Sequence, residues 1–438
     1  MARTLGHQPA LEGVSARRGP DSVALLTLYL VLLLAIPASL VFAPLGAAGG
    51  PATLFAVMLL ACYLLMRLHP GSDLGANPQP VRAAGAIFLC SVLAAYVSAN
   101  RHYLPRAEMN AADRGIISIA GWLAVLIVAA DGIDRADRLK TLLSRMTTGV
   151  MMLAIVGIAE FFTGVDIAKY VTIPGLSFNQ VPTDSLIRDG FSRPFATAAQ
   201  PLEFAALMVI ALPVAIHQAR FAPRELRLRR WLKVAAIAVT IPMTVSRTAL
   251  LGVAITAVVL LPTWPRGHRR RAYAVLLAGG AVLFLASPSL LRAFGTLLWG
   301  ISHGSASTDS RTTAATEALA YVTQHPWLGR GFGTFLPQTY FFTDDEYLST
   351  LITTGVIGLC CLAALFVTGW LAARGARRRA GDVETADLAQ SLAAAIAVSA
   401  ACFATFDVLS FTMAAGLTFL MIGCAGAALR LSSAAGGR

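Results

Sequence analysis

The sequence predicts an all-α polytopic membrane protein with about 12 transmembrane helices, and two observations support this class. Of the 438 residues, 56% are apolar and only 13% are charged, whereas soluble globular chains are about 45–50% apolar and about 25% charged. The apolar residues also fall into blocks of about 20, the length that an α-helix needs to cross the hydrocarbon core. A soluble enzyme and an intrinsically disordered chain are both excluded on these grounds.

Twelve apolar blocks qualify as membrane spans, with boundaries good to about two to four residues. The first block could be mistaken for a signal peptide, but it is too long for one and further spans follow it. The expected spans are 22–43, 51–68, 81–99, 115–130, 147–163, 196–217, 232–246, 248–263, 273–291, 346–371, 389–405 and 408–429.

The positions of lysine and arginine indicate how the chain is oriented in the membrane. With the N-terminus placed in the cytoplasm, the inner loops hold 25 of the 35 basic residues and the outer loops hold 10. We therefore expect a multi-pass protein of the cytoplasmic membrane with both termini in the cytoplasm. The net charge of +12 is explained by these inner anchors, so we expect no nucleic-acid partner.

Two outer segments, 164–195 and 292–345, are longer than simple connectors, and ordered loops of this length are usually functional. In the second, residues 307–309 (Ser-Thr-Asp) can cap a helix. Apolar residues follow at helical spacing until His325-Pro326, and a glycine-rich stretch comes next. This large outer loop is therefore expected to carry a short helix on the membrane surface.

The loops and spans together suggest three parts. Residues 1–146 hold the N-terminal transmembrane helices. Residues 147–371 form a core that includes both long outer loops, and residues 372–438 hold a C-terminal transmembrane pair.

Three arginines at the outer ends of spans or in the outer loop are candidate ligands for an anion, because guanidinium suits bidentate phosphate binding. Arg193 opens a span, Arg247 lies in a tight turn between two spans, and Arg311 lies in the first turn of the expected surface helix. Other interpretations remain open. Arg247 can extend to lipid headgroups, Arg193 can pair with Glu203, and Arg311 can pair with Asp309.

An acidic run, Asp344-Asp345-Glu346, directly precedes a span. A carboxylate in that position can serve as a general base toward a hydroxyl, and the alternative is an interfacial collar that marks the end of the span. No histidine lies within four residues of the run and no cysteines have metal-ligand spacing, so we expect no metal. We also expect no cofactor and no disulfide framework.

Four motifs in order resemble the O-antigen polymerase and ligase superfamily. They are RDGFSRPFATAAQPLEFAA, SRTALLG, SRTTAATEALAYVTQHPWLGRGFGTF and DDEYLSTLITTGVIGL. The resemblance covers roughly residues 150–371, whereas the N-terminal spans match only in hydropathy. Members of this family commonly have a His-Asn pair before the Tyr-Leu of the last motif, where this chain has Asp344 and Asp345. This departure favours a polymerase or a less typical transferase over a ligase that uses histidine.

The resemblance implies an inverting, metal-independent membrane glycosyltransferase that acts at the outer face of the cytoplasmic membrane. Its donor would be a glycan on a polyprenyl diphosphate, and its acceptor a glycan or lipid-linked hydroxyl. Arg193, Arg247 and Arg311 would hold the diphosphate, and Asp344 or Asp345 would be the catalytic base. Membrane lipids and other envelope polysaccharide-synthesis proteins are further expected partners. Two alternatives stay open: a transporter or flippase for a lipid-linked glycan or another anionic solute, and a non-catalytic scaffold.

Overall fold

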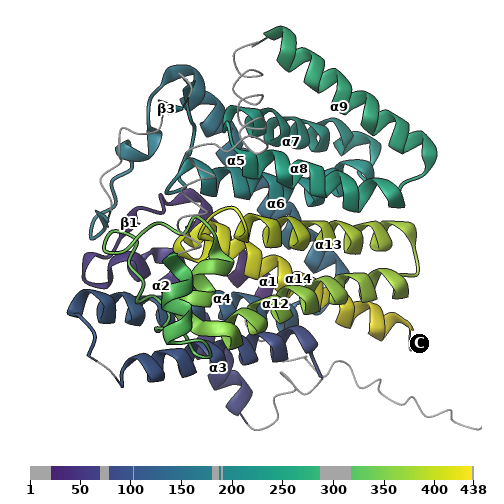
Figure 1. The fold of residues 1–438 in the computed structure, drawn as a ribbon. Coiled ribbons are helices and arrows are strands. Elements are labelled where there is room, and N and C mark those ends of the chain that lie inside the picture. The colour runs from purple at the N-terminus through teal and green to yellow at the C-terminus, as the bar shows by residue number, and fades with distance from the viewer. Residues whose placement is uncertain are drawn as a thin grey trace, which may run out of the picture.

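The computed structural model describes residues 21–69, 78–101, 103–179, 187–188, 191–286 and 317–436. The described chain is mostly helical, and its helices lie alongside one another (Figure 1). They are α1 (Ser22–Ala35), α2 (Pro51–Leu68), α3 (Pro80–Ala99), α4 (Arg106–Gly132), α5 (Ala136–Thr163), α6 (Pro201–Arg220), α7 (Arg224–Met243), α8 (Arg247–Leu260), α9 (Arg266–Ala286), α12 (Glu346–Arg379), α13 (Val383–Phe403) and α14 (Thr412–Gly436).

Short extended and 3-10 segments connect the helices. Strand β1 (Leu40–Val41) pairs antiparallel with β2 (Ser177–Phe178), and β3 (Ile187–Arg188) pairs antiparallel with β4 (Phe191–Ser192). The 3-10 turns are η1 (Ala43–Gly49), η2 (Ile167–Tyr170), η3 (Leu261–Thr263) and η4 (Val408–Ser410).

Eight helices of the described chain are long and apolar enough to cross a membrane: α2, α3, α4, α5, α6, α12, α13 and residues Thr412–Ser433 of α14. Helix α1 and the stretch Arg247–Thr263 are apolar but shorter, while α7 and α9 begin with clusters of basic residues. Every expected block overlaps a helix. These helices identify a multi-pass membrane protein. The total of about 12 spans remains a prediction.

The first expected span, 22–43, is too long at its C-terminal end. Helix α1 ends at Ala35, because Pro37 lacks a backbone N–H and disfavours helical geometry in the residue before it. Leu40 and Val41 then pair with β2 instead of continuing the helix.

The core is built around helices that are apolar on all sides. The spanning stretches of α6 and α14 are each 83% buried, and that of α13 is 78% buried. In α2 and α3 the buried share falls to 28% and 39%. A helix that is apolar all round is either central or faces lipid, so α6, α13 and α14 form the centre and α2 and α3 the periphery. Helix α14 packs against α4 and α12, and α12 also packs against α3 and α13.

Helix α12 is broken at Gly355, which has a φ of 68° and a ψ of −170°. Two N–H groups beyond the break bond to a preceding loop: Val356 N to Pro326 O at 2.9 Å, and Ile357 N to Trp327 O at 3.3 Å. A Cβ at Gly355 would lie 2.3 Å from the Trp327 carbonyl oxygen. Only glycine fits there, both for its positive φ and for this close approach.

The carbonyl groups released by the break are also satisfied. Ile352 O accepts from Arg330 N at 2.9 Å, and Thr353 O accepts from Gly331 N at 2.8 Å. The glycine-rich loop therefore replaces the missing helical bonds on both sides of the break. This arrangement fixes the direction of residues 346–354 relative to the rest of α12.

The structure describes the last part of the expected surface helix, residues 317–324. This part is helical, and it ends at the turn at His325-Pro326. Its expected cap at 307–309 lies outside the described residues.

The bundle has two ends, which differ in their loops. The site end carries the loops before α6, α8, α12 and α14, and these gather on the left of Figure 1 near the labels β1 and β3. The basic end carries the starts of α3 and α5, the ends of α6 and α12, and the C-terminus. The cytoplasmic placement of the basic end and the three-part division of the chain remain predictions.

Candidate functional site

Arg193 lies between β4 and α6 and is half-buried. Its Nε donates to the backbone carbonyl of Thr244, at 2.7 Å. The bond joins the segment before α6 to the turn between α7 and α8. Arg193 is therefore brought to the loop that contains the second candidate arginine.

Arg247 is the first residue of α8 and is half-buried. The first N–H groups of this helix donate no hydrogen bond to the side chain of its N-cap residue, Ser246. Ser246 is fully buried, and its Oγ has no hydrogen-bond partner within the described residues. A helix N-terminus whose N–H groups have no side-chain cap favours an anion. A buried hydroxyl and a guanidinium therefore flank an N-terminus that can accept one.

A hydrogen bond connects the start of α8 to the turn between α13 and α14. Thr248 Oγ1 donates to Thr405 Oγ1 at 2.9 Å. Since that turn also contacts the start of α12, the arginine loops and the acidic run belong to one neighbourhood.

The two candidate bases have different roles in the structure. Asp345 is the N-cap of α12, and its carboxylate accepts from Tyr347 N at 2.9 Å and from Leu348 N at 3.4 Å. Asp344 is exposed and has a φ of 46°. The local structure therefore uses the Asp345 carboxylate for capping and presents that of Asp344 outward.

Glu346, the third acid of the run, is buried and bonds within the protein. Its carboxylate accepts from Thr350 Oγ1 at 3.1 Å and from Leu409 N at 2.8 Å. The acidic run is thus not a uniform collar at the end of a span, because its three members are respectively exposed, capping and buried.

Asp407 lies in the turn between α13 and α14, facing the acidic run. Burial raises the pKa of this carboxyl above its usual range, and the negative charge of Asp344 raises it further. A carboxyl whose pKa is raised retains its proton to a higher pH. In the sequence, residue 407 was treated only as a connector between two expected spans, so its place opposite the acidic run was not predicted. An acidic residue in a two-residue turn between apolar blocks was the sequence feature that could have indicated it.

Two buried glutamates hold the loops of the site end through backbone amides. Glu160 accepts from Ile167 N at 3.2 Å, Phe195 N at 3.1 Å and Ala196 N at 2.7 Å. Glu160 is an acid within an apolar span, and such residues usually have a specific partner. That signal was present in the sequence.

Glu203, which is 0% exposed, also holds loops of the site end by accepting hydrogen bonds from backbone amides. It accepts from Ala199 N at 2.8 Å, Met413 N at 2.7 Å and Ala414 N at 3.1 Å. Both of its oxygens are therefore engaged by backbone N–H groups. These bonds attach the segment before α6 to the first turn of α14.

Three residues other than glycine have a positive φ in the described chain: Ala196 at 50°, Val245 at 43° and Asp344 at 46°. Such a conformation is strained, especially for β-branched valine. Each lies within three residues of a candidate site residue. Strained backbone that is held by its surroundings concentrates at functional sites.

The structure thus brings Arg193, Arg247, Asp344 and Asp345 to one end of the bundle, on segments that bond to one another. Arg311 lies outside the described residues. Within the described ranges, no three His, Cys, Asp or Glu side chains are grouped so that they could hold a metal ion.

Comparison with known protein families supports the resemblance that the sequence motifs indicated. Residues 232–363 match the family described as O-antigen ligase, which confirms the resemblance to the O-antigen polymerase and ligase superfamily. The matched segment runs from α7 into α12 and includes Arg247, Asp344 and Asp345, whereas Arg193 lies before it. No curated protein matches the chain.

Proposed function

We propose that this chain is a membrane glycosyltransferase that transfers or polymerises a glycan carried on a polyprenyl diphosphate. The observation that carries the proposal is the meeting of two arginine-bearing loops with the start of α12 at the site end of the bundle. The family match over residues 232–363 supports transfer, and it gives no support to a transporter or flippase.

In this proposal the leaving diphosphate binds at the N-terminus of α8. Arg247 and Arg193 contribute guanidinium groups, and the unpartnered Oγ of Ser246 is a further donor. Arg311 is a third candidate cation. Donors fixed in place before the reaction stabilise the negative charge that develops as the diphosphate departs.

Asp344 acts as the general base. An acceptor hydroxyl attacks the anomeric carbon of the donor while its proton passes to the Asp344 carboxylate. The bond between that carbon and the diphosphate oxygen breaks, and the electron pair leaves with the carrier diphosphate. A single displacement of this kind inverts the anomeric configuration and needs no metal. Asp345 is the alternative base, but its carboxylate already caps α12.

The 25:10 distribution of basic residues supports placing the site end at the outer face of the cytoplasmic membrane. The isoprenoid tail of the carrier would lie among the spanning helices. The acceptor is a second lipid-linked glycan or another lipid-linked hydroxyl, and other proteins of envelope polysaccharide synthesis are candidate partners.

Analysis of lipid-linked and surface glycans in a deletion strain tests the proposal. Single repeat units that accumulate on the carrier indicate a polymerase, and long unattached polymer indicates a ligase. Restoration by the wild-type chain, but not by an Arg247→Ala chain of equal abundance, is expected. A deletion strain with unchanged lipid-linked and surface glycans would contradict the proposal.

A further inference from the structure

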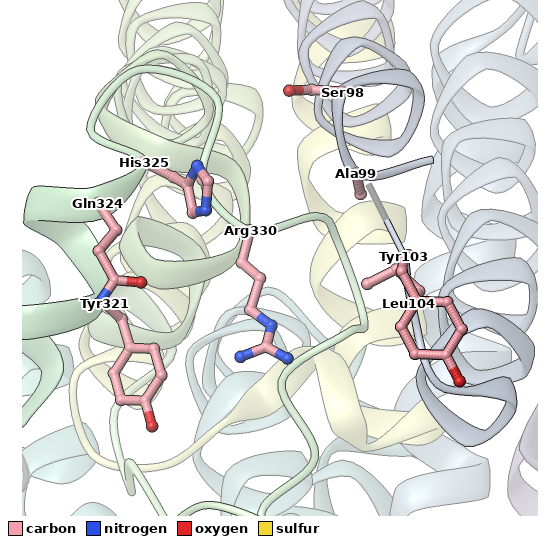
Figure 2. A pocket seen from close by; sticks show the side chains of 9 residues that line it. Ser98, Ala99, Tyr103, Leu104, Tyr321, Gln324, His325 and Arg330 are labelled. Atoms are coloured by element: carbon pink, nitrogen blue, oxygen red, sulfur yellow. The ribbon is translucent and has the colours of Figure 1, made fainter. Parts of the chain in front are cut away.

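A pocket at the site end lies between the connection from α3 to α4 and the helical segment 317–324 (Figure 2). Its volume is about 160 Å³. The polar and aromatic residues that line it include Ser98, Tyr103, Tyr321, Gln324, His325 and Arg330.

An ion pair fixes the guanidinium of Arg330 in this pocket. Its Nη2 donates to both carboxylate oxygens of Glu108, at 3.0 and 2.9 Å, and also bonds to the hydroxyl of Tyr340. The guanidinium carbon lies 4.5 Å from the centre of the Tyr340 ring. Figure 2 shows the guanidinium between Tyr321 and Tyr103, directed into the space between them.

Glu108 also compensates the charge of Arg330. The Glu108 side chain is 3% exposed and that of Arg330 is 23% exposed, so the pocket presents a fixed array of N–H donors with little net charge. Burial and the hydrogen bond to Glu108 raise the pKa of Tyr340, which keeps its hydroxyl protonated. A neutral ligand with many hydroxyl groups suits this wall better than a diphosphate does.

The pocket is close to the proposed base. Tyr340, which contacts Arg330, is four residues before Asp344, and four extended residues span at most about 14 Å. The backbone of Arg330 is itself bonded to Ile352 O in α12. A short segment therefore joins the pocket to the acidic run, and the pocket loop also bonds directly to the helix that begins at that run.

We infer that this pocket is a subsite for one neutral sugar ring of the lipid-linked glycan, a few units from the bond that is formed. A sugar ring has an apolar C–H face that packs on aromatic side chains, and a rim of hydroxyls that bonds to amide, imidazole and guanidinium groups. The polar lining does not suit an isoprenoid tail, which has no hydroxyl groups to pair with it. Tyr103, which is 93% exposed, forms the open edge over which the glycan continues.

This inference rests on the proposed function, and a binding experiment separates the two. The probe is the oligosaccharide released by mild acid from the lipid-linked glycan of the deletion strain, which has no diphosphate. The test variant is the double substitution Tyr103→Ala, Gln324→Ala, because both side chains are exposed and their removal leaves the fold intact. The control is Tyr170→Ala, which removes another tyrosine that is 77% exposed, in η2.

We expect the double variant to bind the released oligosaccharide about 3- to 10-fold more weakly than wild type, as for the loss of one or two neutral contacts. With intact lipid-linked glycan as substrate, its KM should rise by a similar factor while kcat stays within about twofold. Tyr170→Ala should match wild type in both assays.

Unchanged oligosaccharide affinity in the double variant would overturn the subsite, whatever the enzyme does. A fall in kcat at unchanged KM would overturn it as well, because that pattern indicates displaced catalytic groups. Oligosaccharide binding that depends on Tyr103 and Gln324, in a protein with no transfer activity, would keep the subsite and contradict the proposed reaction.

Discussion

The two ends of the bundle use their acidic residues in different ways. At the basic end, carboxylates pair with cationic side chains: Arg82 with Asp131 at 2.6 Å, Lys140 with Glu384 at 2.6 Å, and His217 with Asp387 at 2.8 Å. At the site end, Glu160, Glu203, Glu346 and Asp345 accept hydrogen bonds from backbone N–H groups. Ion pairs also occur at the site end, where Arg330 pairs with Glu108 in the pocket wall and Lys169 pairs with Asp166 at η2.

The difference shows how each end is adapted. Side-chain ion pairs at the basic end join helices that already have regular backbone. At the site end the chain leaves helical geometry, and a buried carboxylate is the strongest acceptor that can hold several amides at once. The acids there stabilise the shape of the loops that bring the arginines and the exposed aspartate to the same end of the bundle.

The largest expected effect distinguishes the two adjacent aspartates. Asp344→Asn should lower the transfer rate of purified protein about 100- to 10,000-fold, the range for loss of a general base. Asp345→Asn should retain most of the rate, because asparagine is also a good N-cap. Initial rates with lipid-linked glycan measure both. A larger loss for Asp345→Asn would assign the base to Asp345, and equal losses would contradict the distinction between the two aspartates.

The second prediction compares one acid from each end. Glu203→Gln places an amide N–H₂ group against backbone donors, so the loop before α6 should shift and the rate per folded molecule should fall about 10- to 100-fold. Asp387→Asn breaks a buried pair with His217 and Arg220, which should lower the melting temperature while the rate per folded molecule stays within about twofold.

Rates normalised to folded protein, together with melting temperatures in detergent, check this comparison. If Asp387→Asn reduces the normalised rate as much as Glu203→Gln does, the two ends do not differ in the way described.

The smallest expected effect concerns pH. Because burial raises the pKa of Asp407, its proton stabilises the folded chain at low pH. That stability is lost as the pH rises from about 4, the pKa of an aspartate in the unfolded chain, through the raised pKa of Asp407 in the folded chain. Asp407→Asn avoids this loss. The melting temperature of the variant relative to wild type should therefore increase by about 1–3 °C between pH of about 4 and pH of about 7. A constant difference over this range would contradict the assignment.

Hydropathy predicted where the helices lie, because lipid-facing and central helices must both be apolar along their length. It did not predict where α1 ends, although Pro37 was a visible signal, and it gave no indication that Gly355 breaks α12. The break depends on a loop that supplies hydrogen bonds from residues 326–331. Such a contact is tertiary, and only the cluster of glycines in that loop hinted at it.

The candidate site shows the same limit. The arginines and aspartates were found because charges at the ends of apolar spans are unusual. Glu160 and Glu203 were not assigned to the site, since their partners are backbone amides whose positions depend on the folded loops. Asp344 and Asp345 were indistinguishable in sequence, and only the capping bonds of Asp345 separate them.

Binding of a polyprenyl diphosphate without sugar, measured with protein in nanodiscs, tests the central claim most directly. Arg247→Ala should weaken this binding about 10- to 150-fold, the loss expected for a charge-assisted contact. Arg247→Lys should fall between Arg247→Ala and wild type, because lysine keeps the charge but not the planar fork. Arg82→Lys, at the basic end, should bind as wild type does. An Arg247→Ala protein with unchanged affinity would contradict the diphosphate site at the start of α8.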